Sequence, residues 1–137
     1  MPNQLSADLV VVGDIKTIRG GQLSRAAVLP VTYQNKASAA TAPTIPAGAT
    51  LTGINVIVTT QSNDSGTATL AVGWVGGAGT ELVAAQDVKS AAGAFPQTGN
   101  TVKVGTTLTA TRQLQAQYSG TSATAGTFLV LVSYVTV

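Results

Sequence analysis

The sequence predicts an all-β protein: an antiparallel β-sandwich or jelly roll with an extended N-terminal arm. Three observations support this fold class. Apolar residues recur at every second position in several segments, whereas the periodicity of a long helix is hard to find. Turn residues separate about seven or eight such segments at intervals of roughly 10 residues. The segment 128–137 is apolar on both faces, as a strand covered on two sides requires.

The length of 137 residues fits one domain, which we expect to consist of an arm (residues 1–25) and a β domain (residues 26–137). The first 24 residues have no clean period and run into the pair Gly20 and Gly21, which predicts an extended arm with a short strand at residues 14–19. The chain has no cysteine, so packing and backbone pairing must hold the fold without disulfides.

The first strand of the β domain is predicted from an alternation in which one set of positions faces the core: Ala27, Leu29, Val31 and Tyr33. Pro30 lacks a backbone N–H for the ladder, so this strand should lie at a sheet edge or carry a bulge. Residues 38–46, rich in Ala, Thr and Pro, are predicted to form a loop.

Residues 51–75 are predicted to form a hairpin. Residues 51–60 are rich in β-branched side chains, and residues 61–66 contain the Asn, Asp and Gly of a tight turn. In the second strand one set of side chains should point together into the core: Ala68, Leu70, Val72 and Trp74.

Two later segments carry open questions. Residues 80–88 lie between glycine clusters and fit a short helical turn as well as a strand. Residues 108–118 alternate as a half-buried strand whose polar side is a neutral row: Thr109, Thr111, Gln113, Gln115 and Gln117. That row fits a solvated surface and a hydrogen-bonding seam between subunits equally well.

The doubly apolar segment 128–137 would be an aggregation template if its edge were exposed. It is therefore expected to be central in a two-layer sandwich or to be shared with a second copy. We expect the surface for self-association to include this strand, with these residues: Phe128, Val130, Val132 and Tyr134.

Composition argues against enzymatic chemistry. Only 9% of the residues are charged and there is no His or Cys, so nucleophile–base pairs that need either residue cannot form. The glycine run at residues 76–79 lacks the lysine of a phosphate loop. Asp64, Glu81 and Asp87 are the only carboxylates available to pair after residue 14, and Asp64 fits a hairpin turn better than a Ca²⁺ site. We expect no catalytic residue, metal or cofactor.

The net charge of +2 lies in the first 36 residues, where Lys16, Arg19, Arg25 and Lys36 outnumber two aspartates. The basic residues are isolated, so direct binding of nucleic acid is not expected. Neither a signal peptide nor a membrane span is expected, because the apolar runs are shorter than the roughly 20 residues that a spanning helix needs.

A resemblance follows from residues 44–56 (TIPAGATLTGINV) and residues 67–73 (TATLAVG). It continues through residues 82–88 (LVAAQDV) and 91–93 to the ending 124–135 (TAGTFLVLVSYV), and it covers roughly residues 26–137. In these segments the chain resembles the small jelly-roll virion proteins of tailed bacteriophages.

The resemblance implies a structural virion protein, most simply a homotrimeric cement (decoration) protein on the outer surface of a phage head, assembled in the host cytoplasm. Its partner would be the major capsid protein. The resemblance does not include the first 25 residues, and the excess of positive charge there leads us to expect that the arm contacts the capsid through Lys16, Arg19 and Arg25. The alternative is a head-fibre or tail-associated module that presents loops to host-surface glycan. Trp74 and Tyr118 fall in register with apolar neighbours, so we expect them in the core, which leaves Phe95 as the one clear loop aromatic.

Overall fold

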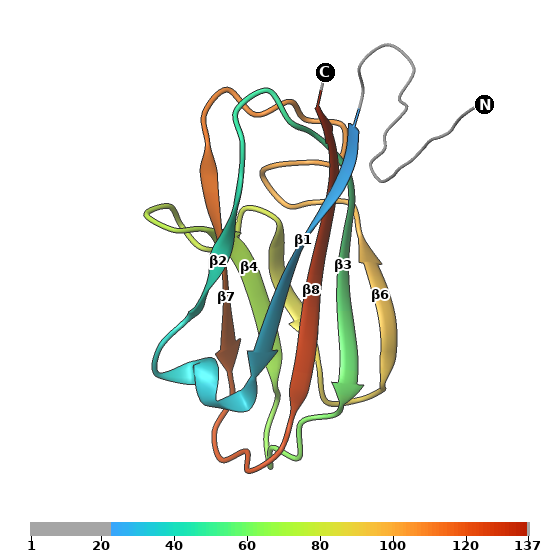
Figure 1. The fold of residues 1–137 in the computed structure, drawn as a ribbon. Coiled ribbons are helices and arrows are strands. Elements are labelled where there is room, and N and C mark those ends of the chain that lie inside the picture. Colours follow the sequence, from blue (N-terminus) through green and yellow to red (C-terminus); the bar gives the residue numbers. More distant parts are fainter. Residues whose placement is uncertain (1–22, 137) are drawn as a thin grey trace, which may run out of the picture.

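The computed structural model describes residues 23–136, which form two stacked antiparallel sheets of four strands each (Figure 1). Sheet I has the strand order β1–β8–β3–β6, and sheet II has the order β2–β7–β4–β5. The strands are β1 (Leu23–Thr32), β2 (Ala40–Ile45), β3 (Thr50–Thr60), β4 (Thr69–Trp74), β5 (Val83–Asp87), β6 (Gly93–Gln97), β7 (Arg112–Ser119) and β8 (Thr127–Thr136). A 3-10 helix, η2 (Tyr33–Lys36), follows β1.

The strand pairing is nested. β1 pairs with β8, β2 with β7, β3 with β6 and β4 with β5, all antiparallel. This is the arrangement obtained when one long hairpin is wrapped around a common core, as in a jelly roll. The predicted all-β sandwich is therefore confirmed.

The core lies between the sheets and consists of the inward-facing half of each strand. Ala27, Leu29 and Val31 are buried from β1, as the alternation predicts, and so are Ala68, Leu70, Val72 and Trp74 around β4. The rings of Tyr118 and Phe128 stack across the two sheets with their centroids 5.8 Å apart and their planes 6° apart. Period-two burial on both sheets thus produces one continuous apolar layer.

The terminal strand β8 lies between β1 and β3, so its backbone is paired on both sides within the chain. Its residues Phe128, Val130, Val132 and Tyr134 are buried against sheet II. The expected contact of these four side chains with a second copy is wrong, because the core of the same chain already covers them. The opposite side of β8 carries the half-buried Leu129, Leu131 and Val135.

The predicted hairpin of residues 51–75 is also wrong. β3 belongs to sheet I and β4 to sheet II, so the link between them crosses from one layer to the other. Within that link, Ser62 and Asp64 are buried. A turn signal marks a reversal of direction, but it does not say whether the next strand pairs with the last one or packs over it.

Several boundaries differ from expectation. Residues 38–46 contain β2, an edge strand with a register shift between Thr41 and Thr44, in place of a loop. Of the two alternatives left open for residues 80–88, the structure has the strand, since these residues contain β5 (Val83–Asp87). β7 begins at Arg112, so Thr109 and Thr111 precede it. The placement of Pro30 in an edge strand is confirmed, since β1 ends one side of sheet I.

The start of β1 at Leu23 places Arg25 inside sheet I. Residues 1–22, with Lys16, Arg19 and the predicted strand at residues 14–19, lie outside the described residues. Within residues 23–136, no helix has the length and apolar character needed to cross a membrane.

Candidate docking face

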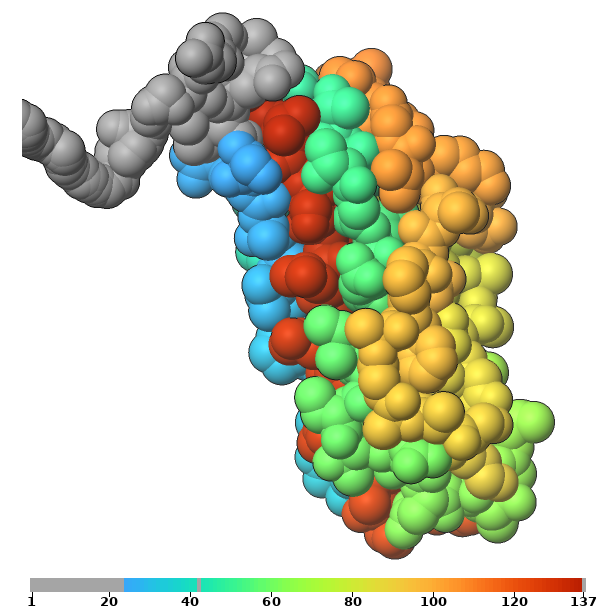
Figure 2. All heavy atoms as spheres, turned by 90° about the vertical axis from the view of Figure 1, so that its right-hand side faces the viewer, coloured from blue at the N-terminus to red at the C-terminus, as the bar shows by residue number. Residues whose placement is uncertain are grey.

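The outer face of sheet I is built from the residues that alternate with the core positions. Register places them in rows that run across all four strands. One row is Val28, Leu131, Asn55 and Pro96, and the next is Pro30, Leu129, Ile57 and Ala94. We call these eight residues the outer face of sheet I. Figure 2 shows the four strands side by side on this surface, with β1 in blue, β8 in red, β3 in green and β6 in gold.

This face is apolar and uncharged. Val28 is 45% exposed, and Leu129, Leu131 and Ile57 are half-buried by their neighbours. Among residues 23–136, no Asp, Glu, Lys or Arg occupies an outward position in the central part of sheet I, where Asn55 and the nearby Ser133 are the polar side chains. An apolar patch that spans several strands is a feature of surfaces that bind a partner.

The outer face of sheet II has a different chemistry. Its outward positions on β2, β7 and β4 are Thr41, Thr44, Gln113, Gln115, Gln117, Thr69 and Ala71. Gln117 donates its side-chain N–H to the carbonyl of Lys36 at 3.0 Å, which ties η2 to this sheet. Thr and Gln side chains hydrogen-bond readily to water. The two faces therefore divide the surface into an apolar side and a polar side.

The sheet edges are protected against the addition of another strand. Pro30 lies in edge strand β1, Pro96 in edge strand β6 and Pro43 in edge strand β2. The fourth edge strand, β5, has five residues and an irregular register with β4. Proline and irregular pairing are both devices that block edge-to-edge association. The edges of both sheets are thus poor sites for pairing with another strand.

Asp64 accepts several hydrogen bonds that hold loops together at one end of the sandwich. The Gly66 N–H donates to its Oδ1 at 3.0 Å, and Thr121 N–H and Ser122 N–H donate to its Oδ2 at 2.7 and 3.1 Å. The Tyr118 hydroxyl also donates to Oδ2, at 3.2 Å. The bond from Gly66, followed by those from Thr121 and Ser122, lowers the pKa of Asp64 although its burial acts in the opposite direction.

This arrangement joins the β3–β4 link to the β7–β8 loop. Ser62 Oγ lies 2.6 Å from the Tyr118 hydroxyl and accepts the Asp64 N–H at 3.1 Å. Gly120 is needed beside this cluster, because a Cβ there would lie 2.3 Å from Asp64 Oδ2. Asp64 thus accepts hydrogen bonds from its own turn, as the sequence suggested, and also from a loop more than 50 residues away.

Glu81 organises the β4–β5 loop in a similar way. Its Oε1 accepts from Trp74 N–H and Gly79 N–H, both at 3.0 Å, and its Oε2 accepts from Ala78 N–H at 2.9 Å. Burial tends to raise the pKa of Glu81, but the backbone donors outweigh it and hold the pKa below its ordinary value. The carboxylate lies so close to Gly73 and Gly77 that neither position has room for a Cβ.

Replacing Glu81 by Gln is expected to loosen this loop. The amide offers one acceptor oxygen and places N–H donors near backbone N–H groups, so the bonds to Ala78 and Gly79 weaken. We expect faster amide exchange at these two residues and a loss of about 1 kcal/mol of stability, a small value because solvent screens the partly exposed site. Asp87→Asn at the end of β5 is the control, and unchanged exchange at Ala78 in Glu81→Gln would contradict the assignment.

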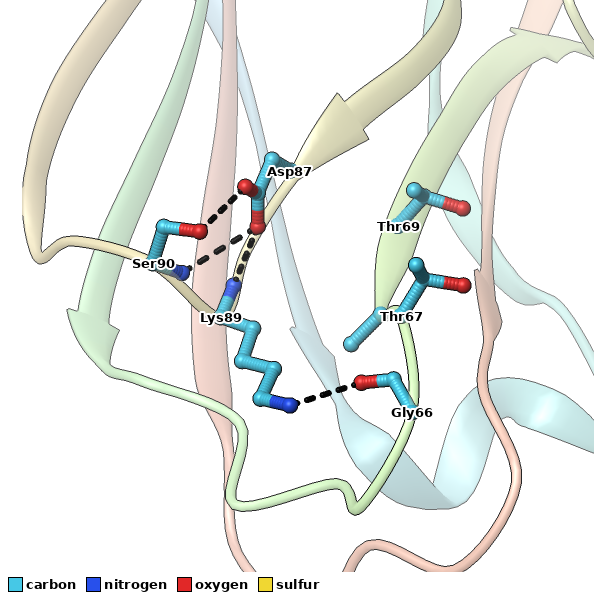
Figure 3. A pocket seen from close by; sticks show the side chains of 7 residues that line it. Gly66, Thr67, Thr69, Asp87, Lys89 and Ser90 are labelled. Carbon is cyan, nitrogen blue, oxygen red and sulfur yellow. Dashed lines mark hydrogen bonds between the residues drawn. The ribbon is translucent and has the colours of Figure 1, made fainter.

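A pocket of about 480 Å³ lies beside β4 and β5 (Figure 3). Its charged groups bind their neighbours: Asp87 accepts from Ser90 Oγ at 2.5 Å and from Lys89 N–H at 2.8 Å, and Lys89 Nζ donates to the Gly66 carbonyl at 2.9 Å. The hydrogen bonds from Ser90 and Lys89 lower the pKa of Asp87. Asp64, Glu81 and Asp87 thus each hold a loop in place, and no cluster of metal-ligating side chains occurs in residues 23–136.

None of the six aromatic side chains is fully exposed. All six lie within residues 23–136: Trp74, Tyr118, Phe128 and Tyr134 are buried, and Tyr33 and Phe95 are half-buried. The expectation of core positions for Trp74 and Tyr118 is confirmed. The placement of Phe95 in a loop is wrong, since it lies in β6 opposite Val56 and packs on the core.

Of the basic residues assigned to the arm, Arg25 is exposed near the start of β1. Arg25 is not one of the residues of the outer face of sheet I. That face was not predicted from the sequence. A signal for that face was present in the sequence, because Leu129, Leu131 and Val135 form the second apolar half of the terminal strand. The sequence did not show which of the two apolar sides of this strand faces the core.

Comparison with known proteins gives similarity at the level of the fold. No family model and no curated protein sequence matches the chain. The chain is similar to one in the "Cyanophage Pam1 capsid asymmetric unit", with 20% identity over 100% of both chains and a TM-score of 0.69. It is also similar to one in the "Acidic stable capsid structure of Helicobacter pylori bacteriophage KHP30", with 14% identity over 83% of this chain and 90% of that chain and a TM-score of 0.67. The β-sandwich of this protein is thus a fold that also occurs in chains of two phage capsid structures.

Proposed function

We propose that this protein is a structural component of a phage virion that decorates the outside of the capsid and stabilises the contacts between capsid subunits. The observation that carries the proposal is the full-length similarity in fold to a chain of a phage capsid structure. The described surface agrees with a binding role, because its carboxylates hold loops and the outer face of sheet I is apolar.

The proposed mechanism is mechanical. The protein works as an oligomer, with a trimer as the expected state, and spans neighbouring copies of the major capsid protein. Each bridge adds buried surface across a seam of the shell, so pressure from packaged DNA must break more contacts to open it. Lys16 and Arg19 of the arm, together with Arg25 near the start of β1, would contact an acidic capsid surface.

Neutralising the arm is expected to weaken attachment. The triple variant Lys16→Gln, Arg19→Gln, Arg25→Gln removes three positive charges, and we expect its affinity for heads stripped of the protein to fall at least about tenfold at low salt. The measurement is co-sedimentation of the full chain with such heads, repeated at increasing ionic strength.

A matched control removes the same charge elsewhere. Lys36, Lys103 and Arg112 are exposed and lie in η2, in a loop and at the start of β7. The triple variant Lys36→Gln, Lys103→Gln, Arg112→Gln should bind heads like the wild type. Equal loss in both variants would contradict the role of the arm, and a wild-type protein that ignores heads but binds a glycan array would replace decoration by the host-glycan function.

A further inference from the structure

We propose that the outer face of sheet I is the surface through which copies of this chain bind each other. This inference deepens the oligomer of the proposed function, on which it rests, and its test concerns association of the free protein and not capsid attachment. It replaces the contact that the sequence assigned to Phe128, Val130, Val132 and Tyr134, which the core of the chain buries. The same strand supplies Leu129 and Leu131 from its other side.

The charge pattern fits a second copy better than a charged partner. Identical faces that converge around the axis of a symmetric oligomer bring like charges together unless the charges are arranged in complementary pairs. The outer face of sheet I avoids this problem, since its eight residues are Val, Leu, Ile, Pro, Ala and Asn. Interfaces between identical subunits are also more apolar than other protein surfaces. Of the basic residues proposed for the capsid contact, Lys16 and Arg19 precede the described residues, and Arg25 lies near the start of β1 and is not one of these eight residues.

The eight residues are the centre of a larger surface, the whole outer side of sheet I. β1 and β8 each have ten residues and β3 has eleven, so these strands are about 33 Å long at a rise of about 3.3 Å per residue, whereas β6 has five residues. With strands spaced about 4.8 Å apart, this outer side has a projected area on the order of 550 Å². A standard interface buries about 800 Å² of accessible surface on each partner, and accessible surface exceeds its projection.

The prolines at both edges of sheet I favour contact through this face. Pro30 in β1 and Pro96 in β6 each remove a backbone donor from an edge strand, which discourages a continuous sheet between copies. Both prolines belong to the rows of the outer face of sheet I. They therefore make the edges poor sites for pairing while they add apolar surface to the face.

The test places a charge in this face and an equal charge elsewhere. Val28 is 45% exposed on the face and Val75 is 43% exposed in the loop after β4, so Val28→Lys and Val75→Lys form a matched pair. The measurement is sedimentation equilibrium of the full chain, with circular dichroism to verify folding. We expect an oligomeric wild type, an oligomeric Val75→Lys and a folded Val28→Lys whose association is at least about 100-fold weaker, because its lysine would be buried without a partner.

A second variant strengthens the test. Leu131→Lys alters the centre of the row and should also dissociate the oligomer, while Val28→Lys covers the case in which Leu131→Lys fails to fold. A monomeric wild type, or a Val28→Lys variant with wild-type mass, would overturn the proposal. Binding to capsids is measured separately, so loss of oligomers with retained head binding, or the reverse, shows which of the two proposals has failed.

Discussion

Leu70→Ala is expected to reduce the free energy of unfolding by roughly 2 to 5 kcal/mol. Leu70 is fully buried in β4, between Tyr118 of β7 and Gln86 of β5 in the register of sheet II. Truncation removes apolar contacts and leaves a cavity that two closely packed sheets cannot easily close. A domain has only about 5 to 15 kcal/mol of net stability, so this single substitution would remove a large part of the free energy of unfolding.

Guanidinium denaturation followed by Trp74 fluorescence provides the measurement, since this side chain is buried in the same strand. Val75→Ala is the control, because Val75 is 43% exposed and its truncation should change stability by less than about 0.5 kcal/mol. If Leu70→Ala were as mild as Val75→Ala, the closely packed core described above would be wrong.

Asp64→Asn is expected to lower the unfolding temperature more than any substitution in the exposed loops. The amide would place two N–H donors where Gly66, Thr121 and Ser122 already donate, so at least one buried donor would lose its acceptor. Ser65→Ala is the matched control, since the 2.9 Å bond between Ser65 and Ser122 joins the same two loops at an exposed position. Calorimetry that showed equal effects would contradict a central role for Asp64.

The same carboxylate predicts a pH dependence. The pKa of Asp64 is lowered in the folded state from its ordinary value of 3.8, so near that value the unfolded chain binds more protons. Its contribution to stability is complete above the unfolded pKa and is lost as the pH falls through the lower folded pKa. The wild type should therefore lose stability more steeply than Asp64→Asn between about pH 5 and pH 2, and parallel curves would refute this.

The sequence was sufficient to identify most strands but not their neighbours. Period-two alternation shows which residues share a side of a strand, and the inward sets around β1 and β4 follow from it. It contains no information on pairing partners, so β3 and β4 were joined into a hairpin although they lie in different sheets. In residues 38–46 the mixture of Ala, Thr and Pro hides β2, which forms because β7 offers a partner.

The outer face of sheet I could not be predicted from the sequence for a related reason. Both halves of β8 are apolar, and the sequence alone does not say which half faces sheet II. The structure places the two aromatic side chains, Phe128 and Tyr134, on the inner side, where larger rings fill the space between the layers. The role of Asp64 was accessible only in part, because Thr121 and Ser122 lie 57 and 58 residues away along the chain.

The position of β8 has a consequence for biosynthesis. β1 and β3 are neighbours only through β8, which is translated after the other seven strands. A nascent chain on the ribosome therefore cannot complete sheet I before residues 127–136 are available. Until then the apolar inner surface of the sheet stays partly uncovered. Such long-range closure slows folding and leaves translation intermediates open to chaperones. A ribosome stalled before codon 127 should thus hold a chain that proteases digest readily, whereas release of the finished strand should bring resistance.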